Sequence, residues 1–206
     1  MTISNRREKE KEDLHRSILS AAREIFLEKG YDQTSIRNIA QKIDYSPTTI
    51  YLYFKDKDAI FHALHIEGFQ ILHNRMEPLF SVEDPFQRLI AMGRIYMAFA
   101  AENPDFYDLM FVQKAPIEFL DNEEPWKEGE NSFNGLMLTI QQCMDNGTLN
   151  FKDAEIGAYL VWSMMHGMII LNAKERCMII SDEKQADIVE LSFAAFTEML
   201  NQFKKP

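Results

Sequence analysis

The stretch that most constrains the fold of this chain covers residues 34–57, TSIRNIAQKIDYSPTTIYLYFKDK. Ile36 and Ile39 recur at helical spacing and predict a short helix with one apolar face. Ser46 and Pro47 then mark a second helix start, because a serine hydroxyl accepts an unpaired backbone N–H and proline fits the first turn. Two short helices joined by a tight turn indicate a helix-turn-helix, whose second helix enters the DNA major groove.

The second of these helices would leave hydroxyl and ammonium groups at its surface. The outward set is Thr48, Thr49, Tyr51, Tyr53, Lys55 and Lys57. Threonine can bond base edges or phosphates, tyrosine can bond phosphate oxygens, and lysine supplies charge near the backbone. The alternative is a packing hairpin with incidental hydroxyls, in which Tyr51 and Tyr53 are half-buried core aromatics.

Residues 14–61 resemble the TetR family of one-component transcription regulators. The resemblance runs from an apolar first-helix face through EKGYDQTSIRNIAQ to YLYFKDKDAIF. It implies double-stranded operator DNA as a partner, a helix-turn-helix DNA-binding domain over residues 1–58, and a helical ligand-binding and dimerisation domain over residues 59–206.

The resemblance also implies roles for single residues. Arg37 matches the base contact of the second helix, and Pro47, Thr48 and Tyr51 match positions that meet base edges. Phosphate-binding positions match Thr49, Tyr53 and Lys57. Either Thr34 or Ser35 can cap the first of the two helices, and Ser46 caps the second. The DNA-facing set that we predict is Ser35, Arg37, Ser46, Pro47, Thr48, Thr49, Tyr51, Tyr53, Lys55 and Lys57.

Two residues depart from the family pattern. Asp44 stands where the turn glycine is usual, and aspartate tolerates a left-handed backbone better than most residues, so we expect the turn to survive. Thr48 stands where many members have glycine or alanine. Its larger side chain means that the operator sequence is not inherited from relatives.

Helix signals continue through the rest of the chain and predict an all-α protein of about nine helices. A long helix is expected from Asp56 to Glu77, and cap-plus-proline pairs at 84–85 and 103–104 open two more. The last helix is expected from Ser181 to Phe203. No alternating apolar pattern between turn residues predicts a strand.

The charge of the chain is unevenly distributed. The formal net charge is −10, yet residues 1–58 carry eleven Lys or Arg against ten Asp or Glu. The acidity therefore belongs to the remainder, and screening confines its field to roughly 10 Å. An acidic remainder discourages non-specific binding to nucleic acid without opposing local phosphate contacts.

Cysteine usage and apolar run lengths predict a cytoplasmic protein with no membrane partner. Cys143 and Cys177 are the only cysteines, which fits a reducing compartment. The N-terminus has charges but no apolar segment typical of a signal peptide. The longest apolar run, residues 160–171, is too short to span a bilayer.

The last two helices carry more apolar surface than one chain needs. Residues 156–171 are apolar nearly all round, and Ser163 and Gly167 would allow close approach of another helix. Family members pair through their last two helices, so the resemblance implies a homodimer through these elements. A two-fold dimer would present its recognition helices to a pseudo-palindromic operator.

The second domain is expected to bind a small apolar or aromatic effector. Trp162, His166 and Gly167 resemble the W…HG element of one C-terminal subgroup of the family. Tyr96 and His166 are the candidate polar groups of the pocket; the alternative is that these residues simply fill a core. The predicted lining is Phe69, Met92, Tyr96, Phe99, Met110, Phe111, Met137, Met144, Trp162, Met165 and His166.

Three other readings remain beside this one: an enzyme, a thiol sensor, and an activator or an adaptor that does not bind DNA. The sequence does not separate the last of these from a repressor. An enzyme is not expected, because no Gly-rich phosphate loop, nucleophile elbow or metal-binding His–Glu helix is present. A thiol sensor would use Cys177, which follows Lys174 and Arg176, rather than Cys143. His62, His65 and His73 lack nearby ligand partners, so we expect neither metal nor cofactor.

Overall fold

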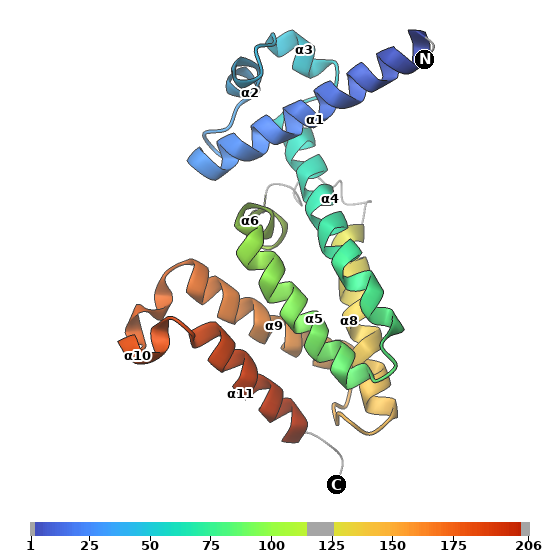
Figure 1. The fold of residues 1–206 in the computed structure, drawn as a ribbon, viewed down its shortest axis with the longest axis vertical. Helices are drawn as coiled ribbons and strands as arrows, with labels where there is room; N and C mark the ends of the chain where they lie inside the picture. Colours follow the sequence, from blue (N-terminus) through green and yellow to red (C-terminus); the bar gives the residue numbers. More distant parts are fainter. Residues whose placement is uncertain (1–2, 115–125, 203–206) are drawn as a thin grey trace. The chain divides into compact units, whose positions relative to one another are not determined.

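The structure, a computed structural model, describes residues 3–114 and 126–202, and all regular structure within them is helical (Figure 1). This confirms the all-α prediction, with ten α-helices and two 3₁₀ helices in these ranges rather than about nine helices. The chain divides into two compact units, residues 1–70 with 103–126, and residues 71–102 with 127–206. The predicted boundary between residues 58 and 59 falls in the first turn of α4 and stays a prediction of how activities divide.

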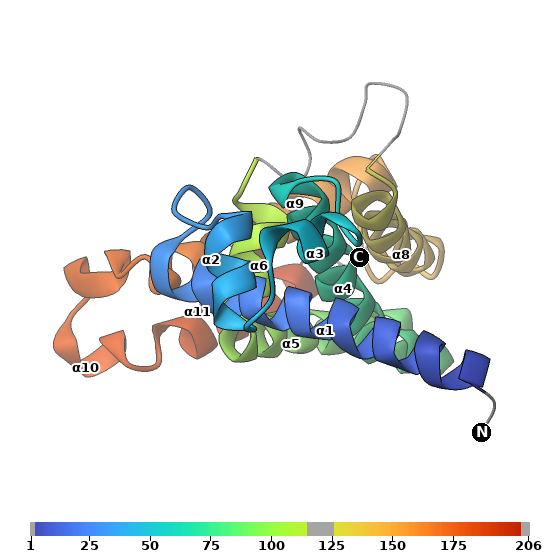
Figure 2. The ribbon, with the colours of Figure 1, turned by 90° about the horizontal axis from the view of Figure 1, so that it is seen from above.

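The first unit is built on the helix-turn-helix. Its helices are α1 (Ile3–Lys29), α2 (Ile36–Lys42), α3 (Pro47–Tyr51), most of α4 (Lys57–Met76) and α6 (Pro104–Phe111). In both views α2 lies against α1 (Figures 1 and 2). The buried side chains of this unit include Ile18 on α1, Ile39 on α2, Ile50 on α3 and Phe61 on α4, all fully buried. Ile50 and Phe54 face inward as their helical spacing predicts.

The second unit is a helical bundle. It contains the end of α4 with η1 (Glu77–Ser81), α5 (Pro85–Glu102), α8 (Lys127–Asp145), α9 (Ala154–Ala173), η2 (Arg176–Ile179), α10 (Asp182–Gln185) and α11 (Ile188–Gln202). α5, α8 and α9 pack against one another, and α11 lies beside α9. Gly93 on α5 lets Phe193 approach closely, because an added Cβ would lie 2.7 Å from that ring.

Two helix boundaries differ from those expected. The first helix begins at Ile3 rather than near Lys11. The expected last helix from Ser181 is divided into α10 and α11, with Ala186 as the C-cap of α10. The sequence did not predict this break, because no helix-terminating glycine or proline marks it. The expected end at Phe203 lies outside the described residues.

Candidate nucleic-acid interface

The entry to α2 is fixed by side chains next to it in sequence. Ser35 is the N-cap, and its hydroxyl accepts the Asn38 backbone N–H at 3.3 Å. The Asn38 side chain returns the contact by accepting the Ser35 N–H at 2.8 Å. Thr34 is buried and donates its hydroxyl to the Gly30 carbonyl at 2.8 Å. These reciprocal bonds satisfy N–H groups that a helix start leaves unpaired.

The turn between α2 and α3 is a Schellman motif with aspartate at the left-handed position. Asp44 has φ +58°, as its tolerance of that region predicts. The Tyr45 N–H donates to the Ala40 carbonyl at 3.0 Å, and the Asp44 N–H donates to the Gln41 carbonyl at 3.3 Å. These two bonds close the end of α2 and set the direction in which α3 begins.

α3 is held by its first turn. The Ser46 hydroxyl accepts the Thr49 backbone N–H at 3.2 Å, and the two hydroxyls of these residues lie 2.9 Å apart. Pro47 occupies the first helical turn, where no N–H is needed. Both cap predictions for α3 are therefore confirmed, and a five-residue helix has a defined start.

The outer surface of α2 and α3 contains most of the predicted DNA contacts. Ser35, Arg37, Ser46, Pro47, Thr48, Tyr51 and Lys55 are exposed, and Thr49, Tyr53 and Lys57 are half-buried. Leu52, which is 79% exposed directly after α3, lies on this surface as well and was not among the predicted contacts. Its spacing of four from Thr48 places the two on one helix face, and that spacing could have identified it.

Lys57 is held within its own unit. Its ammonium donates to the Tyr31 carbonyl at 3.0 Å and lies 3.8 Å from the centre of the Tyr31 ring. The Tyr31 hydroxyl donates to Asp58, and burial together with that carboxylate raises the pKa of Tyr31. An ammonium has three N–H groups, so these contacts leave donors for a phosphate.

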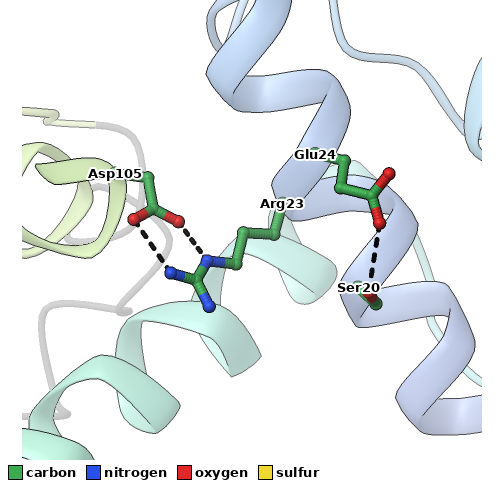
Figure 3. Close-up of polar contacts among 4 residues, drawn as sticks. All are labelled: Ser20, Arg23, Glu24 and Asp105. Atoms are coloured by element: carbon green, nitrogen blue, oxygen red, sulfur yellow. Dashed lines mark hydrogen bonds and ion pairs between the residues drawn. The ribbon is translucent and has the colours of Figure 1, made fainter. Parts of the chain in front are cut away.

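The helices around this surface are joined by charged contacts. Lys42 on α2 pairs with Glu24 on α1 at 2.9 Å. Arg23 points from α1 toward Asp105 on α6, and its guanidinium forms two hydrogen bonds with that carboxylate, one of them at 3.0 Å (Figure 3). The Asp105 side chain is only 2% exposed. α6 is thereby connected to the helix against which α2 packs.

Two family patterns match this chain. The pattern of bacterial regulatory proteins of the tetR family matches residues 18–64, which include α2, α3 and the turn between them. The pattern of the tetracyclin repressor-like C-terminal domain matches residues 89–196, more than half of the chain. The chain belongs to the TetR family. The second pattern describes the family's C-terminal domain in general, so the W…HG subgroup stays a prediction.

Individual TetR relatives agree with this assignment. A helix-turn-helix type regulator from Bacillus subtilis is 25% identical over 87% of both chains. A helix-turn-helix type transcriptional repressor from Mycobacterium tuberculosis is 47% identical over 55% of this chain and 54% of its own. The solved structure of AibR in complex with isovaleryl coenzyme A and operator DNA has a TM-score of 0.69 at 17% identity, over 90% of this chain and 96% of AibR. This TetR-family chain is a DNA-binding transcriptional regulator.

The candidate effector residues of this TetR chain fall into two groups. Phe69, Met110 and Phe111 belong to the first unit, where the Phe69 and Phe111 rings lie edge to face with centroids 5.4 Å apart. The second unit holds the others, namely Met92, Tyr96, Phe99, Met137, Met144, Trp162, Met165 and His166. Neither unit therefore contains the whole candidate set.

The polar candidates of the second unit do lie together. The Trp162 indole N–H donates to the Tyr96 hydroxyl at 3.0 Å, which joins α9 to α5. The Trp162 and His166 rings have centroids 6.2 Å apart. Burial lowers the pKa of His166, so the neutral imidazole is favoured near neutral pH.

Two further features bear on the earlier expectations. By length and composition, α9 is long and apolar enough to span a membrane. The expectation from residues 160–171 alone therefore underestimated the length of the apolar segment. Only 28% of its apolar window is buried.

Within residues 3–114 and 126–202, no group of three His, Cys, Asp or Glu side chains could hold a metal ion. His65 instead accepts the Trp126 indole N–H at 3.0 Å.

Proposed function

We propose that this chain is a cytoplasmic homodimeric repressor that binds a palindromic operator through α2 and α3 and releases it when a small effector occupies the second unit. The observation that carries the proposal is the capped α3 helix with Thr48, Tyr51 and Leu52 exposed beside it. A short helix with a fixed start can present side chains to base edges at low entropic cost.

The division of labour on this surface follows from chemistry. Arg37 and Thr48 are exposed on successive helices and supply groups suited to base edges. Thr49, Tyr53 and Lys57 supply hydroxyls and an ammonium suited to phosphates, which fix position but carry no sequence information. Ser35 and Ser46 act mainly as caps, since their hydroxyls accept backbone N–H groups.

Dimer formation is proposed from the surface of α9. Its exposed apolar side chains follow helical spacing along one stripe, namely Ile156, Tyr159, Leu160, Met164 and Leu171. Gly167 lies in the same stripe, and a Cβ built on it would meet no atom of the described residues within 4 Å beyond its chain neighbours and the backbone of its own helix. Leu191 adds an exposed apolar side chain from the neighbouring α11. A second copy would bury this stripe, which explains an apolar α9 without a membrane.

Release by an effector is proposed as a population shift. A ligand changes DNA affinity only as far as it binds two dimer conformations with different affinity. AibR, which shares the fold, has been captured with an acyl coenzyme A and operator DNA. Because both are bound together there, that complex supports ligand binding and DNA binding by this fold, and release of this chain from DNA by its ligand is our own proposal.

Thr48→Ala and Tyr53→Phe together test the DNA interface. Thr48→Ala should change base preference at one operator position by about 1–3 kcal/mol, because it removes an edge contact. Tyr53→Phe should weaken binding to all duplexes equally, because it removes a phosphate contact. Selection from a random duplex library, followed by affinities measured at fixed salt, distinguishes the two effects.

Ser20→Ala is a matched control, since Ser20 is an exposed hydroxyl of α1 outside the proposed surface. The interface would have to be reassigned if Thr48→Ala kept the wild-type preference at every position. The same follows if Tyr53→Phe lost affinity at one base pair alone.

A further inference from the structure

The second unit contains a buried arginine that pairs with no carboxylate among the residues that the structure describes. Arg88 follows the first turn of α5 and is 6% exposed. Burying a guanidinium is unfavourable unless an anion or a full set of hydrogen bonds compensates for lost water. Within the part of the chain that the structure describes, no ion pair joins Arg88 to a carboxylate.

Among the described residues, the side chain of Arg88 contacts neutral groups. One terminal nitrogen donates to the Gln142 amide oxygen, and the guanidinium lies 5.7 Å from the centre of the Phe80 ring. Its Nε–H is buried and has no acceptor among the described residues. The guanidinium therefore retains both a net charge and a directed donor that the described residues do not satisfy.

Two nearby groups could supply negative charge, and neither neutralises Arg88. Asp84 caps α5 by accepting the backbone N–H groups of Phe86 and Gln87, at 2.8 and 3.3 Å. Cys143 on α8 is fully buried, and burial raises the pKa of its thiol to about 11 against the opposing effect of Arg88. The thiol is thus uncharged near neutral pH.

Arg88 stands at one end of a line of polar contacts along α5. Four residues further on, the Met92 sulfur lies 3.6 Å from the Thr139 hydroxyl, which also donates to the Gly135 carbonyl at 3.0 Å. Eight residues on, Tyr96 accepts the Trp162 indole N–H at 3.0 Å. Spacings of four and eight keep the three residues on one helix face, about 6 and 12 Å from Arg88 at 1.5 Å per residue.

We propose that Arg88 binds the oxyanion head group of an effector whose apolar tail lies along the Met92 and Tyr96 face of α5. The inference rests on the proposed function and sharpens the expected effector from an apolar molecule to an anionic amphiphile. A planar guanidinium suits a carboxylate or phosphate ester, and the unpaired Nε–H supplies one bond of that recognition. Methionine along the tail path is adaptable enough to pack against an alkyl chain.

The first test uses the unaltered full-length protein. Decanoate, decyl phosphate, decanol and decyltrimethylammonium share one tail and differ in head group. Isothermal titration should give affinity for one of the two anions about 10- to 100-fold above that for decanol, as expected for a charge-assisted bond. Whichever anion binds more tightly identifies carboxylate or phosphate as the head group. Equal affinity for the alcohol, or no binding of either anion, would overturn the proposal.

The second test removes the charge. Arg88→Met should bring the affinity for the preferred anion down to that for decanol. Arg94→Met is the matched control, since Arg94 lies on the same helix, exposed and paired with Glu190, and should keep the preference. A preference for the anion that survives in Arg88→Met contradicts the assignment.

Two readouts separate this inference from the proposed function. If Arg88→Met also unfolds more readily in urea, the head-group series on the unaltered protein still decides the question. DNA release is measured independently by adding each ligand to the operator complex. Arg88-dependent binding without DNA release supports the anion site and contradicts effector-driven release. DNA release by decanol alone supports release and overturns the anion site.

Discussion

At the scale of single residues, Asp44 decides whether α2 and α3 meet at the observed turn. Its φ of +58° lies in the left-handed region, which costs most L-residues about 1–2 kcal/mol and glycine almost nothing. Aspartate reduces that cost without removing it. Aspartate is therefore tolerated at this turn, whereas glycine would be the residue of lowest conformational cost.

Asp44→Gly is expected to raise the free energy of unfolding by up to about 1 kcal/mol, and Asp44→Ala to lower it by about 1 kcal/mol. Urea denaturation followed by circular dichroism measures both. Gln41→Ala, an exposed change in the last turn of α2, is the control and should alter stability little. An alanine variant more stable than the glycine variant would mean that the turn does not require a left-handed residue.

The two cysteines differ in reactivity for a physical reason. Burial raises the pKa of Cys143 to about 11, so roughly one thiol in a thousand is ionised at pH 8. Cys177 is half-exposed in η2. Ellman's reagent at pH 8 should therefore modify one thiol per native chain quickly and the second only after denaturation.

The Cys177→Ser variant tests this assignment directly. It should show no fast reaction in the native state and one reactive thiol in urea. Rapid modification of the native Cys177→Ser variant would show that Cys143 is reactive and would make it a candidate redox sensor.

At the scale of helices, many local signals could be predicted from the sequence and distant contacts could not. The expected starts at Asn103 and Ser181 are exceptions, since neither N-cap makes a side-chain cap bond. The sequence predicts Ser46 as a cap, and this can be read locally because a cap bonds an N–H only three residues away. The pair of Arg23 and Asp105 joins residues 82 positions apart. Nothing in periodicity or capping encodes such a contact, since it depends on how α1 and α6 pack. The same holds for the buried Arg88, which resembles any surface arginine in the sequence.

The contact between α1 and α6 should contribute measurably to stability. Asp105→Asn keeps the shape of the side chain but leaves the Arg23 guanidinium without its carboxylate. Because Asp105 is buried and Arg23 is about one-third exposed, the expected loss is about 2 kcal/mol in the free energy of unfolding.

A control for this prediction exists on the same helix. Arg16 pairs with Asp13, and both side chains are more than half exposed. Asp13→Asn should therefore change stability by less than about 0.5 kcal/mol. Equal losses for Asp105→Asn and Asp13→Asn in urea denaturation would show that burial does not strengthen the contact with α6.

At the scale of the whole molecule, the proposed activity depends on two copies acting together. One recognition helix contacts a single half-site, and its affinity is limited by a few side chains. A dimer gains because the second half-site binds at a high effective concentration once the first is bound. The apolar stripe on α9 is thus as important for DNA binding as the residues of α3.

Leu160→Glu places a charge in the centre of that stripe. Leu160 is 48% exposed in the single chain, so the change should leave the monomer fold intact while opposing association. Sedimentation should show a monomer at concentrations where the wild type is dimeric. Affinity for a palindrome with half-sites 34–36 Å apart should fall by about 100-fold, whereas affinity for an isolated half-site should not change.

Leu138→Glu on α8 is the matched control, because Leu138 is 50% exposed outside the stripe, and it should keep both the dimer and palindrome binding. A dimeric Leu160→Glu, or a monomeric Leu138→Glu, would place the subunit interface elsewhere.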